Sequence, residues 1–328
     1  MTATQAQETK LIDPLMHDFA MPLEATYYPL GFPVHIATNS NGILLAAEES
    51  WGRFRQMHSI PPLHMRIGVL NGGSPECPGD PVVREQRSLR ARVADAENFS
   101  FTDIRNGFAY AWLTQATVAA RGYLRWHFVE GISWDLLEPY LTPVHGGCVR
   151  FDGRGVLVCG DSGAGKSSFT YACAKRGWTF MSDDSSNLVR GREGAVVVGN
   201  PYQIRFRESA IALFPELAAQ IVRPRITGEM SIELSTSSVP EIKTTLESPV
   251  DHILFLNRSL AGPPRIVSHT KEDALRWFEQ VIVCREQDVV EAHKAALRNL
   301  LTANVHELRY SEMTPAIECL EKFILTSS

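Results

Sequence analysis

A glycine-rich segment near the middle of the chain constrains the fold more than any other feature. In this type of loop, successive backbone N–H groups point at phosphate oxygens, and the helix that follows adds its N-terminal dipole. The lysine of the pattern reaches the outer phosphates, and the hydroxyl after it coordinates Mg²⁺. The segment therefore predicts a nucleoside triphosphate site with a magnesium ion. It fits the pattern G-x-x-x-x-G-K-[ST], and its residues, with the serine that follows, are Gly160, Asp161, Ser162, Gly163, Ala164, Gly165, Lys166, Ser167 and Ser168.

The residues on either side of this loop favour the same interpretation. Before it, residues 156–159 are a short apolar run rich in β-branched side chains, as is typical of a buried parallel strand. After it, Phe169, Ala172 and Cys173 recur at helical spacing. Gly177 then follows two basic residues and predicts the end of that helix. Strand, loop and helix in this order are the context that a phosphate-binding loop requires.

The composition excludes several classes of protein. A net charge of −5, with 44% hydrophobic and 21% charged residues, provides no basic field for nucleic acid. The 6 cysteines form no C-x-x-C pair, which suits a reducing compartment. No apolar run approaches the roughly 18 residues of a membrane span, and the polar start of the chain lacks the apolar region of a signal peptide. We therefore expect a cytoplasmic protein with no membrane or nucleic-acid partner.

A length of 328 residues predicts two domains. Apolar patterns predict strands at 34–37 and 65–70 around a helix at 42–51, which describes a smaller α+β domain over residues 1–127. A helical pattern at 128–140, bracketed by prolines, predicts a junction over residues 128–142. Residues 143–328 then form an α/β domain that contains the glycine-rich loop. Its further predicted elements are a strand at 178–181, a hairpin over 187–198, a strand at 252–256 and helices from 270 and from 287.

Two adjacent carboxylates follow the strand that is expected after the helix of the loop. In a parallel sheet, ligands bind beyond the carboxyl ends of the strands, where Asp183 and Asp184 would lie. One carboxylate can hold Mg²⁺, while its neighbour faces the other way and accepts a proton from an attacking hydroxyl. The alternative is that both residues end a strand and start a turn. Their position one β-α-β unit after the loop favours the functional interpretation.

A wider set of residues matches a known family: His145 and Gly146, residues 153–167, Arg176 and Gly177, and residues 182–184. In these residues the chain resembles the catalytic domain of the HPr kinase/phosphorylase family. The resemblance implies a P-loop-containing catalytic domain of the HPr-kinase type, assembly into a homo-oligomer, and ATP-dependent phosphorylation of a serine in a protein or peptide. Founding members of the family also remove the phosphate by phosphorolysis.

The resemblance also implies roles for individual residues. Asp183 would be the general base, His145 an active-site neighbour, and Asp184 a carboxylate that holds the metal together with Ser167. Arg205, in Gln203-Ile204-Arg205, aligns with the arginine of a family signature and is the best candidate to neutralise charge on the transferring phosphoryl group. Further candidates are Arg207, Arg223 and Arg225, for which solvated surface charges are the alternative.

Two positions depart from the family pattern. The residue after Ser167 is Ser168, where the family usually has glutamate, and Gln203 stands where the signature has glutamate. A neutral amide cannot supply the same charge to a metal ion. These departures weaken the case for a second metal site and for phosphorolysis.

The sequence thus predicts an ATP-dependent kinase that transfers the γ-phosphoryl group to a hydroxyl, with serine as the acceptor implied by the resemblance. Two other functions stay open. A small-molecule kinase would use the same loop and base, since both serve any alcohol. A nucleotide-gated regulatory module would keep the loop but would not turn over.

Overall fold

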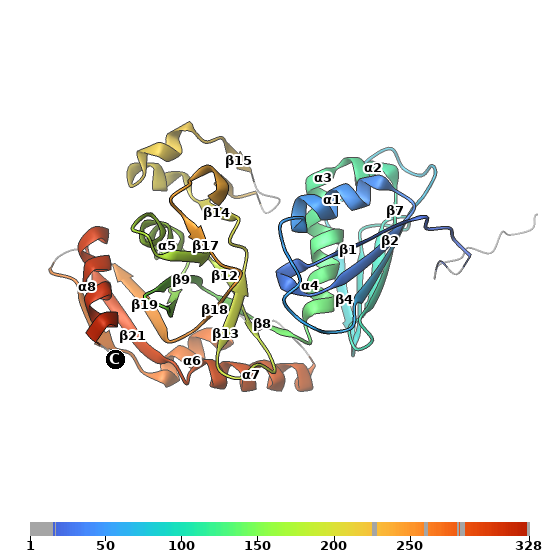
Figure 1. Ribbon diagram of the computed structural model, residues 1–328. Helices are drawn as coiled ribbons and strands as arrows, with labels where there is room; N and C mark the ends of the chain where they lie inside the picture. The colour runs from blue at the N-terminus through green and yellow to red at the C-terminus, as the bar shows by residue number, and fades with distance from the viewer. Residues whose placement is uncertain are drawn as a thin grey trace, which may run out of the picture. The chain divides into compact units, whose positions relative to one another are not determined.

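The computed structural model describes residues 16, 18–224, 228–258, 262–280, 282 and 286–326. The chain divides into two compact units, Met1–Leu137 and Glu138–Ser328. Residues 128–137 of the expected junction therefore belong to the first unit. Within the described ranges, no helix combines the length and apolar character needed to cross a membrane. The expectation of an α/β architecture is confirmed in its coarse form, since both units combine helices with large sheets (Figure 1).

The first unit is built on a 7-stranded sheet with the order β1-β2-β3-β7-β6-β5-β4. The strands predicted at 34–37 and 65–70 correspond to β2 and β3, and the helix predicted at 42–51 corresponds to α1. Its elements are β1 (Leu23–Tyr27), η1 (Pro29–Gly31), β2 (Val34–Thr38), α1 (Asn41–Trp51), β3 (Leu63–Val69), β4 (Val82–Gln86), β5 (Leu89–Val93), β6 (Phe99–Asp103), β7 (Phe108–Leu113), α2 (Gln115–Ala119), α3 (Arg121–Tyr123), the π-helical η2 (Leu124–Glu130) and α4 (Gly131–Leu137).

The second unit contains a 7-stranded sheet of order β17-β11-β9-β10-β19-β21-β20 and two smaller sheets, β18-β13-β12-β8 and β14-β16-β15. The hairpin predicted over 187–198 corresponds to the antiparallel pair β12 and β13. Its strands are β8 (Leu141–His145), β9 (Gly147–Phe151), β10 (Arg154–Cys159), β11 (Thr179–Ser182), β12 (Ser185–Val189), β13 (Val196–Gly199), β14 (Gln203–Phe206), β15 (Val222–Pro224), β16 (Met230–Ser235), β17 (Lys243–Thr244), β18 (Glu247–Pro249), β19 (His252–Arg258), β20 (Arg265–Ser268) and β21 (Asn304–Tyr310).

The helices of the second unit cover both faces of the main sheet. Successive side chains of its central strands point to opposite faces, and they are apolar on both faces, so both must be covered. One buried cluster joins α5 and α8 to one face. The other cluster joins α6, α7 and the β8–β12–β13 sheet to the opposite face (Figure 1). The helical elements are α5 (Lys166–Lys175), η3 (Glu208–Ala212), η4 (Pro215–Ala219), η5 (Thr236–Ser238), α6 (Lys271–Glu279), α7 (Gln287–Leu300) and α8 (Met313–Thr326).

The crossover around α5 differs from the simplest β-α-β unit. Strand β10 pairs in parallel with β19, as a buried run of apolar residues predicts. Its other neighbour is β9, which is antiparallel to both β10 and β11. Strands β10 and β11 therefore point the same way with β9 between them. The carboxyl ends of β10 and β11 still lie at one edge of the sheet, and the predicted site residues follow both.

Candidate functional site

The glycine-rich loop connects the end of β10 to the first residue of α5. Gly163 and Gly165 have φ values of 89° and 93°, in the left-handed region that L side chains rarely adopt. Gly165 is the residue that caps α5, and its carbonyl accepts the N–H of Phe169 at 2.8 Å. The glycines of the motif thus allow a tight turn that leads directly into a helix N-terminus, where backbone N–H groups are available to an anion.

Lys166 is almost fully buried, with 6% of its surface exposed. Its Nζ donates to the carbonyl oxygens of Gly160 at 2.9 Å and Asp161 at 3.4 Å. Nζ also lies 3.1 Å from His145 Nε2 and 3.3 Å from Asp184 Oδ1. The ammonium group is therefore held at the mouth of the loop by residues at the ends of strands β8, β10 and β11.

His145 and Asp184 complete a compact triangle with this lysine. His145 Nε2 and Asp184 Oδ1 are 3.5 Å apart, and both side chains are partly exposed. Burial lowers the pKa of His145; the Asp184 carboxylate opposes this shift, and the Lys166 ammonium group adds a smaller lowering effect. Because a protonated Nε2 cannot accept from an ammonium group, the contact with Lys166 requires the neutral imidazole. The structure brings three of the predicted site residues together.

Asp183 lies beside this triangle with one oxygen already occupied. Its Oδ2 accepts the backbone N–H of Arg205 at 2.8 Å. Burial raises the pKa of Asp183 to about 6, with Asp184 adding to the effect and the Arg205 N–H opposing it. A carboxylate whose pKa is raised toward neutrality is a better proton acceptor than an ordinary aspartate.

Close backbone packing fixes the position of Asp183. A Cβ at Gly147, the first residue of β9, would lie 2.6 Å from the Asp183 carbonyl oxygen and 2.7 Å from Thr170 Cγ2. Nearby, the buried Ser182 and Ser186 hydroxyls are 2.7 Å apart, and Ser186 Oγ donates to the Gly146 carbonyl at 2.8 Å. These contacts join the segment that carries His145 to the segment that carries the two aspartates.

The predicted arginines lie in different environments. Arg205 projects from β14, and its Nε donates to Glu233 Oε1 at 3.0 Å. Arg207 reaches the glycine-rich loop itself, where its Nη2 donates to Ser162 Oγ at 2.9 Å. Arg223 is exposed on β15, and Arg225 lies outside the described residues. Of the three that lie within the described residues, Arg207 is the one with a side-chain hydrogen bond to the loop.

Sequence reasoning missed Trp277, on α6. Its indole Nε1 donates to Asp161 Oδ1 at 3.1 Å, and its ring lies 6.2 Å from the His145 ring at an interplanar angle of 29°. It also contacts Phe255 edge to face at 5.3 Å. Asp161 is 116 residues away in the sequence, so no local pattern identifies this contact.

The residues expected to hold Mg²⁺ offer oxygen ligands of the kind that this ion prefers. Ser167 is the second residue of α5, and the Asp184 carboxylate lies 3.3 Å from the Nζ of the preceding residue, Lys166. In the described part of the chain, no group of three or more histidine, cysteine, aspartate and glutamate side chains is placed to hold a metal. Mg²⁺ usually takes one or two protein ligands and completes its shell with phosphates and water. The hydroxyl and carboxylate therefore fit a nucleotide-bound Mg²⁺ rather than a site formed by protein alone.

Comparison with known proteins identifies relatives of one kind. The chain is 34% identical over 99 residues to an HPr kinase/phosphorylase of Streptococcus thermophilus, which covers 30% of each protein. It is 38% identical over 74 residues to an HPr kinase/phosphorylase of Halalkalibacterium halodurans, which covers 22% of this chain and 24% of that one. The chain thus matches under a third of the length of these curated relatives.

No protein-family model matches the chain. Among solved structures, the HPr(Ser) kinase/phosphatase from Coxiella burnetii aligns with 56% of this chain and 96% of its own, at 13% identity and a TM-score of 0.32. The similarity to these kinases therefore rests on the sequence matches. Over these matched stretches, the chain is similar to HPr kinase/phosphorylases.

Proposed function

We propose that this protein is an ATP-dependent kinase that transfers the γ-phosphoryl group to a serine hydroxyl of a protein or peptide. The observation that carries the proposal is the meeting of Lys166, His145 and Asp184 within 3.5 Å at the mouth of the loop, with Asp183 beside them. A protein that only binds nucleotide needs the loop and its lysine, whereas a second carboxylate with a raised pKa serves proton transfer. The family relationship supports the same class of reaction.

In the proposed reaction, the loop N–H groups and Lys166 bind the phosphates of ATP. The acceptor Oγ attacks the γ-phosphorus as the bond between that phosphorus and the β,γ-bridging oxygen breaks, and ADP leaves. The acceptor proton passes to Asp183, through Oδ1, because Oδ2 is engaged by the Arg205 N–H. Lys166 is already held between the loop and Asp184, so the positive charge is positioned before the reaction begins.

Two further groups are assigned supporting roles. Ser167 and Asp184 would hold Mg²⁺, which when bound neutralises charge on the β- and γ-phosphate oxygens. Arg207 contacts the loop through its hydrogen bond to Ser162. We therefore assign to Arg207 the neutralisation of charge on the outer phosphate, the role that the sequence favoured for Arg205. Arg205 instead contributes its backbone N–H to Asp183 while its side chain pairs with Glu233.

The proposal covers the forward reaction only. Gln203 lies on β14 near Arg205, whose Nη2 is 3.4 Å from Gln203 Oε1. This amide offers no negative charge to a second metal ion. We therefore expect phosphorolysis to be weak or absent relative to the kinase reaction.

Labelled ATP tests the acceptor class directly. The purified protein is incubated with γ-labelled ATP and, separately, with a protein pool, a peptide pool and a metabolite pool. We expect label on serine of a protein or peptide, and loss of that label in Lys166→Ala and Asp183→Asn. Label confined to metabolites would instead establish a small-molecule kinase. Nucleotide binding with equal, negligible turnover in wild type and Asp183→Asn would establish a regulatory module.

A further inference from the structure

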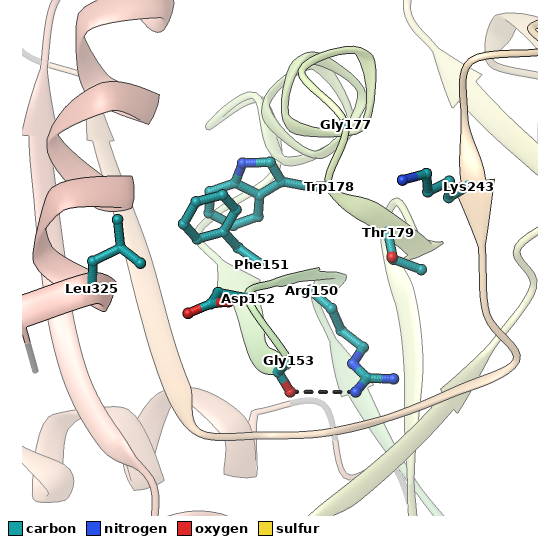
Figure 2. Close-up of a pocket in the computed structure, with 9 residues that line it drawn as sticks. All are labelled: Arg150, Phe151, Asp152, Gly153, Gly177, Trp178, Thr179, Lys243 and Leu325. Carbon is teal, nitrogen blue, oxygen red and sulfur yellow. Dashed lines mark hydrogen bonds between the residues drawn. The ribbon is translucent and has the colours of Figure 1, made fainter. Parts of the chain in front are cut away.

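A pocket lies at the opposite end of the main sheet from the glycine-rich loop. Its volume is about 430 Å³, within the usual range of small-ligand sites. It opens beside the turn between β9 and β10, the start of β11, and the end of α8 (Figure 2). The residues that line it are Arg150, Phe151, Asp152, Gly153, Gly177, Trp178, Thr179, Lys243 and Leu325.

Strand register places two cations on either side of a hydroxyl in this pocket. Thr179 of β11 is the cross-strand partner of Arg150 of β9 and of Lys243 of β17. Cross-strand partners project from the same face of a sheet, and neighbouring strands are about 4.8 Å apart. Arg150 and Lys243 therefore flank Thr179 with roughly 10 Å between their backbones. Because the arginine and lysine side chains are long, a single anion near Thr179 can contact both of them.

Neither cation is neutralised within the described residues. The Arg150 guanidinium makes one long hydrogen bond, from Nη2 to the Gly153 carbonyl at 3.3 Å. Its Nε is buried and has no hydrogen-bond partner in the described part of the chain. In Figure 2, Asp152 lies on the Leu325 side of the pocket, away from Arg150, Thr179 and Lys243. A buried N–H donor without a partner is costly, and a ligand oxygen would remove that cost.

The other wall of the pocket is apolar. The Phe151 and Trp178 rings stack at 4.7 Å with an interplanar angle of 25°, and Leu325 of α8 is 54% exposed beside them. Trp178 is itself fixed by its Nε1, which donates to Glu321 at 3.0 Å. The pocket thus offers a charged side and an apolar side to one small ligand.

We propose that this pocket binds a phosphate dianion, either inorganic phosphate or the phosphate group of a small monoester. Two uncompensated cations match a dianion better than a single carboxylate, and the guanidinium and hydroxyl supply directed donors to its oxygens. The site is distinct from the proposed ATP site. The two sites lie at opposite ends of strand β10. Arg150 is the cross-strand partner of Gly155, the second residue of β10, whereas the glycine-rich loop follows Cys159, the last residue. The inference does not depend on the proposed kinase activity.

Calorimetric titration with inorganic phosphate tests the site. The titration uses the full chain with Lys166→Ala, which weakens phosphate binding at the glycine-rich loop. We expect saturable binding in this background and at least about a tenfold loss when Lys243→Ala is added, as for one charge-assisted hydrogen bond. Thr179→Val should also weaken binding. Lys294→Ala on α7, which removes the same charge elsewhere, should leave it unchanged. Phenyl phosphate binding more tightly than phosphate would favour a monoester as the source, and equal binding would favour the free ion.

Two results would overturn the site. One is the absence of any phosphate-dependent heat in the Lys166→Ala protein at millimolar phosphate. The other is binding that survives both Lys243→Ala and Arg150→Met in protein whose thermal unfolding shows that it is folded. Lys243 is exposed, so its replacement tests the site even if the Arg150 variant does not fold.

Discussion

Asp183 has an environment that should lower the stability of the protein while serving the reaction. Its pKa is about 6 in the folded protein, above the ordinary value of 3.8. The native state therefore binds more protons than the unfolded state between these values, and the free energy of unfolding falls as pH rises through this window. Above pH 6 the carboxylate is ionised in the folded protein, and this loss of stability is complete.

Asp183→Asn should therefore stabilise the fold. We expect the free energy of unfolding to rise by about 1–3 kcal/mol above pH 7, and the gain to vanish near pH 4, where the native carboxyl is protonated. Urea unfolding at both pH values measures it. A loss of stability at neutral pH would show that the carboxylate is stabilised by its surroundings rather than strained by burial.

Trp277 is a second residue with a specific expected effect, because its indole holds the Asp161 side chain of the loop. Trp277→Phe keeps an aromatic ring against Phe255 but removes the donor. We expect ATP affinity to fall about three- to tenfold, the value of one hydrogen bond, with little change in the unfolding temperature. Calorimetry with ATP measures the change, and Trp134→Phe in the first unit is the control. An unchanged affinity would remove Trp277 from the site.

At the scale of elements, local patterns predicted strand, loop and helix well. Each local signal spans only a few residues: the apolar run before Gly160, the helical spacing after the loop, and Gly177 at the end of the helix. Strand β10 and helix α5 form at the positions that these signals predict. The insertion of β9 between β10 and β11 was not predicted, because strand pairing is a non-local choice. For the same reason, the sequence included Arg207 among four candidate arginines but could not identify it as the one that contacts Ser162 of the loop.

The insertion of β9 creates a sharp steric requirement at its first residue. Gly147→Ala would place a methyl group within 2.7 Å of Asp183 and Thr170. We expect the free energy of unfolding to fall by roughly 1–3 kcal/mol, since backbone cannot move aside as a flexible side chain does. Thermal unfolding measures it against Gly122→Ala, whose Cβ would meet nothing within 4 Å. Equal stability of the two variants would contradict the close packing of β9 against the aspartate segment.

At the scale of the whole molecule, every residue assigned to the proposed reaction lies in the second unit. That unit has its own buried clusters on both faces of its main sheet. We therefore propose that residues 138–328 form an independent domain and expect them to unfold cooperatively when expressed alone. Their affinity for ATP should stay within a few-fold of that of the full chain. A fragment that unfolds without a transition, or that loses ATP binding, would show that the first unit completes the fold.

The central claim is that Asp183 accepts a proton during phosphoryl transfer, and the pH dependence of the single-turnover rate tests it most directly. With the acceptor found by labelling, the rate should rise about tenfold per pH unit below 6 and level off above it. Asp183→Asn should lower the plateau by about 10²–10⁴-fold and remove the inflection, with ATP binding retained. A variant that transfers phosphate at the wild-type rate, or that keeps the same pH profile, would contradict the account.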